Sequence, residues 1–219
     1  MFEAVIFDLD GTILNTLDDL ADSANYVLAA QGFPTHPTEQ YKTFVGNGIP
    51  KLIQRMLPTD ASDEVFERTL AAFEKYYDAH KNDKTAPYDG IPELLSVLKS
   101  RGVRLCVLSN KQHDLSVQIV KHHFGENTFD IIRGKMEQFP AKPDPASCND
   151  VISALNIPKS NILYAGDSNV DMQTGHNAGL TKCGVSWGFR SIEELRSAGA
   201  DYIASSPQDI LQIVLGDLE

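Results

Sequence analysis

The chain has 219 residues, a length that predicts one or two domains rather than three. Its 30 acidic and 19 basic side chains give a formal net charge of −11, which argues against a nucleic-acid-binding protein, because such proteins carry basic surfaces. Hydrophobic (42%) and charged (22%) fractions are typical of globular proteins and argue against an intrinsically disordered chain.

The cysteines and the N-terminal residues predict a cytoplasmic protein. The three cysteines are widely spaced and form no Cys-x-x-Cys pair, so a disulfide framework is not expected. No Lys or Arg precedes Lys42, and acidic residues interrupt the first apolar run, which argues against a secretory signal. No apolar run exceeds five residues, so we expect no membrane span.

Short apolar runs alternate with longer amphipathic stretches over most of the chain. The runs at 4–7, 103–108, 162–165 and 181–185 predict strands, the first three buried on both faces. The predicted helices are 92–100, 113–123, 147–155, 171–177, 192–197 and 207–214. This alternation predicts an α/β fold with a mostly parallel sheet.

Residues 17–82 interrupt the alternation, because they show helix patterns and no convincing strand. Apolar residues between Leu17 and Leu28, and between Phe66 and Tyr77, recur with the helical period. We therefore expect a catalytic core formed by residues 1–14 and 86–219, and an inserted all-helical cap domain formed by residues 15–85. Three acidic residues near its start are expected on the first turns of a helix, where negative charge is favourable: Asp18, Asp19 and Asp22.

Polar residues end three of the predicted strands. The first strand runs into Asp8-Leu9-Asp10-Gly11-Thr12, the second into Ser109-Asn110, and the third into Gly166-Asp167-Ser168 with Asp171 on the next helix. Ligands of open α/β sheets bind outside the carboxyl ends of the strands, so these residues should converge. Lys142, directly before a predicted helix, is a candidate to complete the site; alone, it would be interpreted as a solvated loop lysine.

This set of residues suits phosphoryl transfer. A carboxylate can act as nucleophile and form an aspartyl-phosphate, which divides one difficult step into two easier ones. The transferred group spreads negative charge over its oxygens, so catalysis depends mainly on positioning and electrostatic stabilisation. Four aspartates carry −4, and a Mg²⁺ ion with Lys142 would return +3; without the metal, the pocket would repel an anionic substrate.

The pattern Asp8-x-Asp10-Gly11-Thr12, Ser109, Lys142 and Gly166-Asp167-x-x-x-Asp171 resembles the four motifs of the haloacid dehalogenase superfamily in order and spacing. The resemblance implies a Rossmann-like core with a helical cap. It also implies Asp8 as nucleophile, Asp10 as general acid and base, and Lys142 as a further catalytic residue. The implied Mg²⁺ ligands are Asp8, the backbone carbonyl of Asp10 and Asp167, with Asp171 in support. Thr12, Ser109, Asn110 and Lys142 would hold the phosphoryl group.

Two further segments resemble phosphoglycolate phosphatases: Val45-Gly46-Asn47-Gly48 with Lys51-Leu52-Ile53, and Trp187-Gly188-Phe189-Arg190-Ser191. The first predicts a turn leading into a helix whose free amides and positive dipole end attract anions. Lys51 and Arg55 are four residues apart and therefore share a helix face. We expect the cap residues that meet the substrate carboxylate to be Gly46, Asn47, Gly48, Lys51 and Arg55. A surface turn with two solvated cations is the alternative, and Trp187 either lines the cleft or packs beneath the cap.

The leading hypothesis is a Mg²⁺-dependent phosphomonoesterase acting on 2-phosphoglycolate or a similar small phosphorylated metabolite, as a monomer or homodimer. The alternatives on the same core are a phosphosugar mutase resembling β-phosphoglucomutase, and a sugar phosphatase or nucleotidase. Mutase relatives usually carry a nonpolar residue at the position of Thr12, which favours hydrolysis. A non-catalytic anion-binding module would need neither a nucleophile nor an acid and base, so the intact set of motifs argues against it.

Overall fold

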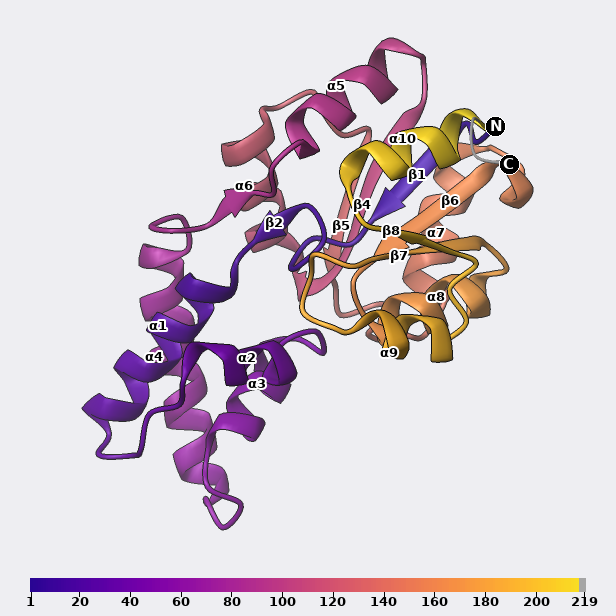
Figure 1. The fold of residues 1–219 in the computed structure, drawn as a ribbon. Helices are drawn as coiled ribbons and strands as arrows, with labels where there is room; N and C mark the ends of the chain where they lie inside the picture. The colour runs from indigo at the N-terminus through magenta and orange to yellow at the C-terminus, as the bar shows by residue number, and fades with distance from the viewer. Residues whose placement is uncertain (217–219) are drawn as a thin grey trace.

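The computed structural model describes residues 1–216, and a six-stranded parallel sheet forms its larger body (Figure 1). The strands, in spatial order, are β5 (Ile131–Lys135), β4 (Arg104–Gln112), β1 (Ala4–Phe7), β6 (Ile162–Gly166), β7 (Thr181–Val185) and β8 (Tyr202–Ala204). Every neighbouring pair is parallel. The site-bearing strands β4, β1 and β6 are therefore adjacent, as the sequence requires for their ends to converge.

Helices cover both faces of this sheet. Apolar residues of α5 (Ile91–Ser100), α6 (His113–Phe124) and α10 (Pro207–Leu215) pack on one face. Those of α7 (Ala146–Leu155) and α8 (Asn169–Ala178) pack on the other. A short 3₁₀ helix, Lys159–Asn161, precedes β6, and α9 (Ile192–Ser197) follows β7. Burial on both faces explains why the central strands are continuous apolar runs. The predicted α/β fold with a Rossmann-like parallel sheet is confirmed.

Four helices form the smaller body, which projects from one side of the sheet (Figure 1). They are α1 (Leu17–Ala30), α2 (Thr38–Phe44), α3 (Ile49–Met56) and α4 (Asp63–His80). We call them the helical bundle; they share a hydrophobic cluster that is distinct from the two clusters flanking the sheet. The chain passes between the two bodies through an antiparallel pair of two-residue strands, β2 (Leu14–Asn15) and β3 (Ala86–Pro87).

Sequence reasoning missed β5 and β8, the two edge strands of the sheet. Both are short, and β5 contains Arg133, Gly134 and Lys135, so neither gives a continuous apolar run. It also ended β4 at residue 108, whereas the strand continues to Gln112. The helix predicted over 147–155 begins one residue earlier, at Ala146, with Pro145 as its N-cap. Short edge strands that contain polar residues are hard to predict from sequence, because only one neighbouring strand pairs with them.

Asp19 lies in the first turn of α1, as expected, and its side chain is buried. Its carboxylate accepts hydrogen bonds from the backbone amides of Lys84 and Thr85 and from the Thr85 hydroxyl, all between 2.7 and 3.1 Å. Asp19 therefore ties the segment leaving the helical bundle to the helix that begins it.

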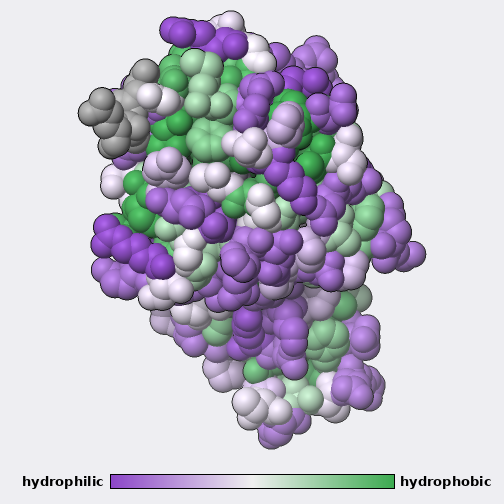
Figure 2. All heavy atoms as spheres, turned by 90° about the vertical axis from the view of Figure 1, so that its right-hand side faces the viewer, coloured by the Kyte–Doolittle hydropathy of each residue, from purple (hydrophilic) through white to green (hydrophobic). Residues whose placement is uncertain are grey.

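Among residues 1–216, no helix is both long and apolar enough to cross a bilayer. Figure 2 shows hydrophobic and hydrophilic residues intermixed on one face of the molecule. Cys106, Cys148 and Cys183 are buried with free thiols, and burial raises the pKa of each thiol to about 12, consistent with hydrophobic filling rather than nucleophilic chemistry.

Candidate active site

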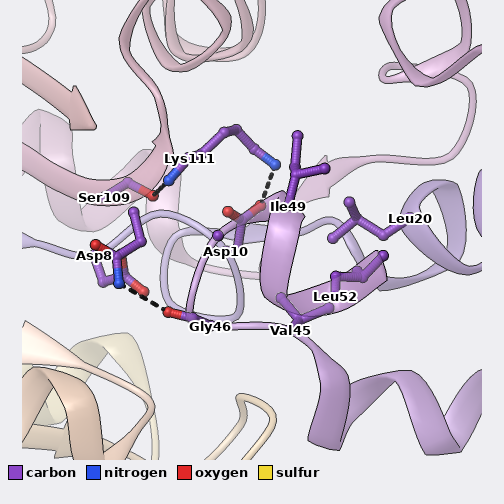
Figure 3. A pocket seen from close by; sticks show the side chains of 11 residues that line it. Asp8, Asp10, Leu20, Val45, Gly46, Ile49, Leu52, Ser109 and Lys111 are labelled. Carbon is purple, nitrogen blue, oxygen red and sulfur yellow. Dashed lines mark hydrogen bonds and ion pairs between the residues drawn. The ribbon is translucent and has the colours of Figure 1, made fainter. Parts of the chain in front are cut away.

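The carboxyl ends of β4, β1 and β6 bring three predicted site residues together. Asp8 follows β1, Ser109 lies within the extended β4, and Asp167 follows β6. All three side chains are buried. Asp8 and Ser109 line a cavity beneath the helical bundle, and Figure 3 shows them with Asp10 on its sheet side. The convergence predicted from the strand ends is present.

Lys142 reaches the same point from the loop before α7. Its ammonium lies 2.8 Å from Asp8 Oδ1 and 2.7 Å from Asp171 Oδ1, and it donates to the carbonyl of Leu108 and the hydroxyl of Tyr164. Although burial favours the neutral amine, the carboxylates of Asp171 and Asp8 raise the pKa of Lys142 well above its usual value. The predicted lysine is therefore a buried cation beside Asp8, not a solvated loop residue.

Three carboxylates face one another at this end of the sheet. Asp8, Asp167 and Asp171 each place an oxygen within 4.8 Å of the others. Burial, together with repulsion from Asp171, raises the pKa of Asp8 to about 7, and burial also raises the pKa of Asp167 well above its usual value. A divalent cation would remove this repulsion, and an all-oxygen donor set is the kind that Mg²⁺ prefers. The residues present therefore fit a metal ion.

The two carboxylates contributed after β6 differ in how they are held. Asp171 closes a capping box at the start of α8: its Oδ2 accepts from the amide and hydroxyl of Ser168, while Oδ1 binds Lys142. Asp167 uses Oδ2 to accept from the Phe189 amide at 2.7 Å. Because protein donors occupy both oxygens of Asp171, this residue fits a supporting role and Asp167 fits a direct ligand.

Close backbone approach around Asp167 requires two glycines. A Cβ on Gly11, whose φ is +86°, would lie 2.3 Å from Asp167 Oδ2, and one on Gly188 would lie 2.2 Å from Asp167 Cβ. Between these loops, Trp187 donates its indole N–H to the carbonyl of Thr12 at 2.9 Å. Trp187 therefore packs on the core and holds the loop after β1. The Thr12 hydroxyl is buried and has no hydrogen-bond partner among residues 1–216.

The same stretch of chain matches a known family. Residues 5–185 match the haloacid dehalogenase-like hydrolases. The chain belongs to this family. It is 32% identical over 217 residues to a phosphoglycolate phosphatase from Neisseria meningitidis, covering 96% of this chain and 92% of that protein. A phosphoglycolate phosphatase from Vibrio parahaemolyticus is 29% identical over 96% of this chain and 95% of its own length.

Solved structures agree with the family assignment. A provisionally named phosphoglycolate phosphatase from Lactobacillus delbrueckii subsp. bulgaricus superposes with a TM-score of 0.93 at 30% identity, covering 98% of this chain and 99% of that chain. Such similarity over nearly the whole length, together with the curated relatives, identifies the protein as a phosphatase of the haloacid dehalogenase-like hydrolase family.

Asp10 of this phosphatase contacts a lysine that sequence reasoning missed. Asp10 Oδ1 accepts from the Thr16 hydroxyl at 2.7 Å and lies 2.8 Å from the ammonium of Lys111. Figure 3 shows Lys111 extending toward Asp10 across the top of the pocket. The signal was available, because Lys111 directly follows Ser109-Asn110. It was missed because β4 was expected to end at residue 108, which would have left Lys111 in a loop.

Asn110, predicted to hold phosphate, is occupied by protein partners. Its side-chain amide donates to the carbonyls of Gly46 and Lys142, and its Oδ1 accepts from the amide of Lys142 at 2.8 Å. The side chain therefore fixes the Lys142 loop and anchors the loop between α2 and α3 above the cleft. In this arrangement, Ser109 and Lys142 remain the core side chains that best fit the predicted role of binding the phosphoryl group.

The face that the helical bundle presents to the cleft is apolar. Gly46 and Gly48 line the cavity together with four hydrophobic residues of the bundle, which Figure 3 shows grouped opposite Asp8 and Ser109: Leu20, Val45, Ile49 and Leu52. The N-terminal end of α3 thus faces the cleft, as predicted. Its cationic side chains do not line it.

Lys51 is the clearest departure from the sequence expectation, because it does not face the cleft. It is exposed, bonded to Gln54 Oε1 at 2.8 Å, and borders a separate hollow on the outer side of α3. The buried stripe of α3, which includes Ile49 and Leu52, occupies the opposite side of the helix and places Lys51 outward. The four-residue spacing correctly placed Lys51 and Arg55 on one face of the helix, but it did not predict whether that face points toward the cleft or away from it.

Arg55 and Asn47, also predicted to bind substrate, bind each other. Arg55 donates to Asn47 Oδ1 and to the carbonyl of Phe44, both at 2.8 Å, so it braces the turn that leads into α3. From the core side, Arg190 donates to the carbonyls of Lys42 and Val45. Arginines on both bodies thus hold this loop through its backbone carbonyls.

Proposed function

We propose that this phosphatase hydrolyses small phosphomonoesters through an aspartyl-phosphate on Asp8, with a bound Mg²⁺ ion, and that 2-phosphoglycolate or a similar small phosphorylated acid is its substrate. The observation that carries the proposal is the position of Asp8. Its carboxylate lies within the acidic cluster, 2.8 Å from the Lys142 ammonium, and on the same loop as Asp10. This grouping of a carboxylate that could act as nucleophile, a cation and a second carboxyl group supports the proposal.

The proposed reaction begins with attack of an Asp8 carboxylate oxygen on phosphorus. Asp10 donates a proton to the departing oxygen of the substrate, so that an alcohol leaves. Asp10, now a carboxylate, then removes a proton from water, which attacks the phosphorus of the acyl phosphate and releases inorganic phosphate and Asp8. Lys142 and the Ser109 hydroxyl stabilise negative charge on the phosphoryl oxygens throughout.

The metal site is proposed from the same residues. Asp8, the backbone carbonyl of Asp10 and Asp167 would hold Mg²⁺, and Asp171 would support them through Ser168 and Lys142. When bound, the ion would supply positive charge that offsets the negative charge of the carboxylates and of the phosphoryl group.

We further propose that residues 15–85 act as a mobile cap over a core of residues 1–14 and 86–219. The separate hydrophobic cluster of the helical bundle and its narrow two-strand connection support this division. The cavity volume is about 30 Å³, space for roughly two water molecules. This narrow cavity lies between the two bodies, so outward movement of the bundle would widen it for the substrate to bind and for the product to leave.

Selectivity for a small acid follows from the cap face and from the relatives. The N-terminal end of α3 places Gly48 and Ile49 at the cavity, where backbone amides and the helix dipole favour an anionic group. The surrounding side chains are apolar, so they offer no partners for the hydroxyl groups of a sugar. Relatives of similar length are named phosphoglycolate phosphatases.

The test is a phosphate-release screen with 2-phosphoglycolate, neutral sugar phosphates and nucleotides, each with Mg²⁺ and with excess chelator. We expect Mg²⁺-dependent release that is fastest, by kcat/KM, with 2-phosphoglycolate. If 2-phosphoglycolate ranks among the poorest substrates, the substrate assignment is wrong while the phosphatase chemistry stands. Isomerisation of a phosphosugar without phosphate release would favour the mutase alternative.

A further inference from the structure

A chain of polar contacts joins the helical bundle to Asp10 across the cleft. Lys111 of β4 lies 2.8 Å from Asp10 Oδ1, and its ammonium donates to the hydroxyl of Tyr77 at 3.0 Å. The same ammonium lies 5.0 Å from the centre of the Tyr77 ring. Tyr77 belongs to α4 of the bundle, whereas Asp10 and Lys111 belong to the body that contains the sheet. The contact therefore exists between two bodies that the proposed reaction requires to separate.

An irregularity in β4 aims Lys111 at this position. Between the pairs Leu108–Arg133 and Gln112–Lys135, β4 advances four residues while β5 advances two. Bulges of this kind re-aim side chains next to active sites. Gly134 permits the close packing of the two strands here, because a Cβ on it would lie 2.6 Å from the Lys111 carbonyl oxygen. The local structure thus places Lys111 on the cleft.

The position of Lys111 depends on its two partners. Only 3% of its side chain is exposed, and a buried ammonium is tolerated where a counter-charge and hydrogen bonds replace water. Asp10 supplies the counter-charge, and Tyr77 supplies a hydroxyl and a ring face. Tyr77 is itself fixed within the hydrophobic cluster of the bundle. Movement of α4 would carry Tyr77 away and expose Lys111 to water.

The contacts of Asp10 leave one of its oxygens available. Both Lys111 and the Thr16 hydroxyl bind Oδ1, and among residues 1–216 no hydrogen bond is made to Oδ2. Two partners on one oxygen fix the plane of the carboxyl group. The other oxygen is then the one left to carry a proton to the departing group.

We propose that Lys111 is a positioning residue for Asp10, and that Tyr77 makes this positioning depend on closure of the helical bundle. In the closed state, Lys111 holds Oδ1 and leaves Oδ2 for proton transfer. In the open state, Lys111 is hydrated and the carboxyl group of Asp10 loses its fixed orientation. Proton transfer is thus available when the cleft is closed. The inference rests on the proposed role of Asp10 as acid and base.

The test compares phenyl phosphate with p-nitrophenyl phosphate, which are similar in size but differ in how much the departing group needs a proton. The release of the phenol in the first turnover measures the step in which Asp10 acts as acid. We expect Tyr77→Phe to slow phenyl phosphate on the order of tenfold, the kinetic equivalent of one hydrogen bond to a charged group. It should slow p-nitrophenyl phosphate less than about twofold, with KM unchanged for both.

Variants at Lys111 extend the same comparison. Lys111→Met should slow phenyl phosphate on the order of 10²-fold, within the usual contribution of general acid catalysis, and Lys111→Arg should recover part of the loss. If Lys111→Met fails to fold, Tyr77→Phe decides, because it removes a single oxygen from a packed ring. An equal slowing of both substrates in Tyr77→Phe would overturn the proposal.

The matched control is Gln112→Ala. Gln112 neighbours Lys111 and also bonds α4, through Glu74 Oε1 at 3.1 Å, but it does not contact Asp10. Gln112→Ala leaves the Lys111–Tyr77 contact intact, so it should not slow phenyl phosphate selectively; if it does so as strongly as Tyr77→Phe, the loss does not come from this contact, and the role assigned to Tyr77 is wrong. Asp10→Asn separates this result from failure of the proposed function. If that variant slows both substrates equally, the acid role of Asp10 is itself wrong.

Discussion

The two sides of the cleft differ in the side chains that line them. On the sheet side, charged side chains form the site: Asp8, Asp167 and Asp171 lie together, Lys142 pairs with Asp8 and Asp171, and all four are buried. On the bundle side, the lining is apolar, and the loop before α3 is held by its backbone carbonyls. Under the proposed function, bond breaking would depend on side chains of the sheet side, whereas substrate selection by the bundle would depend on its backbone and shape.

On the sheet side, activity should be lost when one carboxylate oxygen of Asp8, the proposed nucleophile, is replaced. Asp8→Asn replaces the attacking oxygen with an amide and weakens the metal site, so we expect turnover to fall by at least about 10⁴-fold. The measurement is phosphate release with Mg²⁺, and circular dichroism checks that the variant is folded. A folded variant that hydrolyses phosphomonoesters near the wild-type rate would show that no aspartyl-phosphate forms on this residue.

Asp10 should matter less than Asp8 but more than any residue of the bundle. Asp10→Asn removes proton donation to the departing oxygen and activation of water, which together contribute about 10²–10⁴-fold. We expect kcat for 2-phosphoglycolate to fall within that range, with a smaller change in KM. A kcat within about twofold of wild type would exclude Asp10 as the acid and base.

The contrast between the two sides also explains what the sequence could predict. Asp8, Ser109 and Asp167 follow buried strands, and parallel strands place their carboxyl ends together, so local patterns sufficed. Lys111 was missed because its position depends on a two-residue irregularity between β4 and β5. A bulge arises from the pairing of two strands, and no pattern within one strand reveals it.

The errors on the bundle side have the same origin. Lys51 and Arg55 were correctly placed on one side of a helix, but the orientation of that helix is set by its packing against the rest of the bundle. A cation beside a glycine-rich turn suggests anion binding from sequence. In the folded protein, Arg55 instead satisfies carbonyl groups of its own turn. Tertiary packing, not spacing, decides which polar groups remain for a ligand.

The acidic cluster predicts a metal effect on stability as well as on rate. We expect Mg²⁺ to bind the folded site and not the unfolded chain, so a concentration of about 100 times Kd should stabilise the protein by about 2.7 kcal/mol, raising Tm by roughly 5–10 °C. Thermal melts with Mg²⁺ and with chelator measure this shift. Asp167→Asn should lose most of the gain, yet be at least as stable as wild type in chelator, because it removes one of three mutually repelling carboxylates.

Replacing Mg²⁺ with Ca²⁺ should distinguish metal binding from catalysis at the same site. Ca²⁺ accepts more ligands in looser geometry, so it should raise Tm while supporting little turnover, because it can draw both oxygens of Asp8 into coordination. Equal rates with Ca²⁺ and Mg²⁺, or full activity in chelator, would contradict the proposed metal role.

The smallest expected effect distinguishes substrate selection by the backbone of the bundle from selection by its charged side chains. Gly48 adopts φ 85° and ψ 164°, a conformation that is open essentially to glycine alone, and a Cβ there would lie 3.3 Å from the Asn110 carbonyl. Gly48→Ala should therefore displace the start of α3 and lower kcat/KM for 2-phosphoglycolate several-fold, roughly the effect of 1 kcal/mol.

Lys51→Ala, three residues further along the chain, is the control. Its kcat/KM should stay within about twofold of wild type because Lys51 points away from the cavity. Steady-state kinetics on both variants, with p-nitrophenyl phosphate as the reference substrate, decide the matter. If Lys51→Ala selectively lost activity on 2-phosphoglycolate while Gly48→Ala did not, selection would reside in a side-chain charge, and the contrast between the two sides of the cleft would fail.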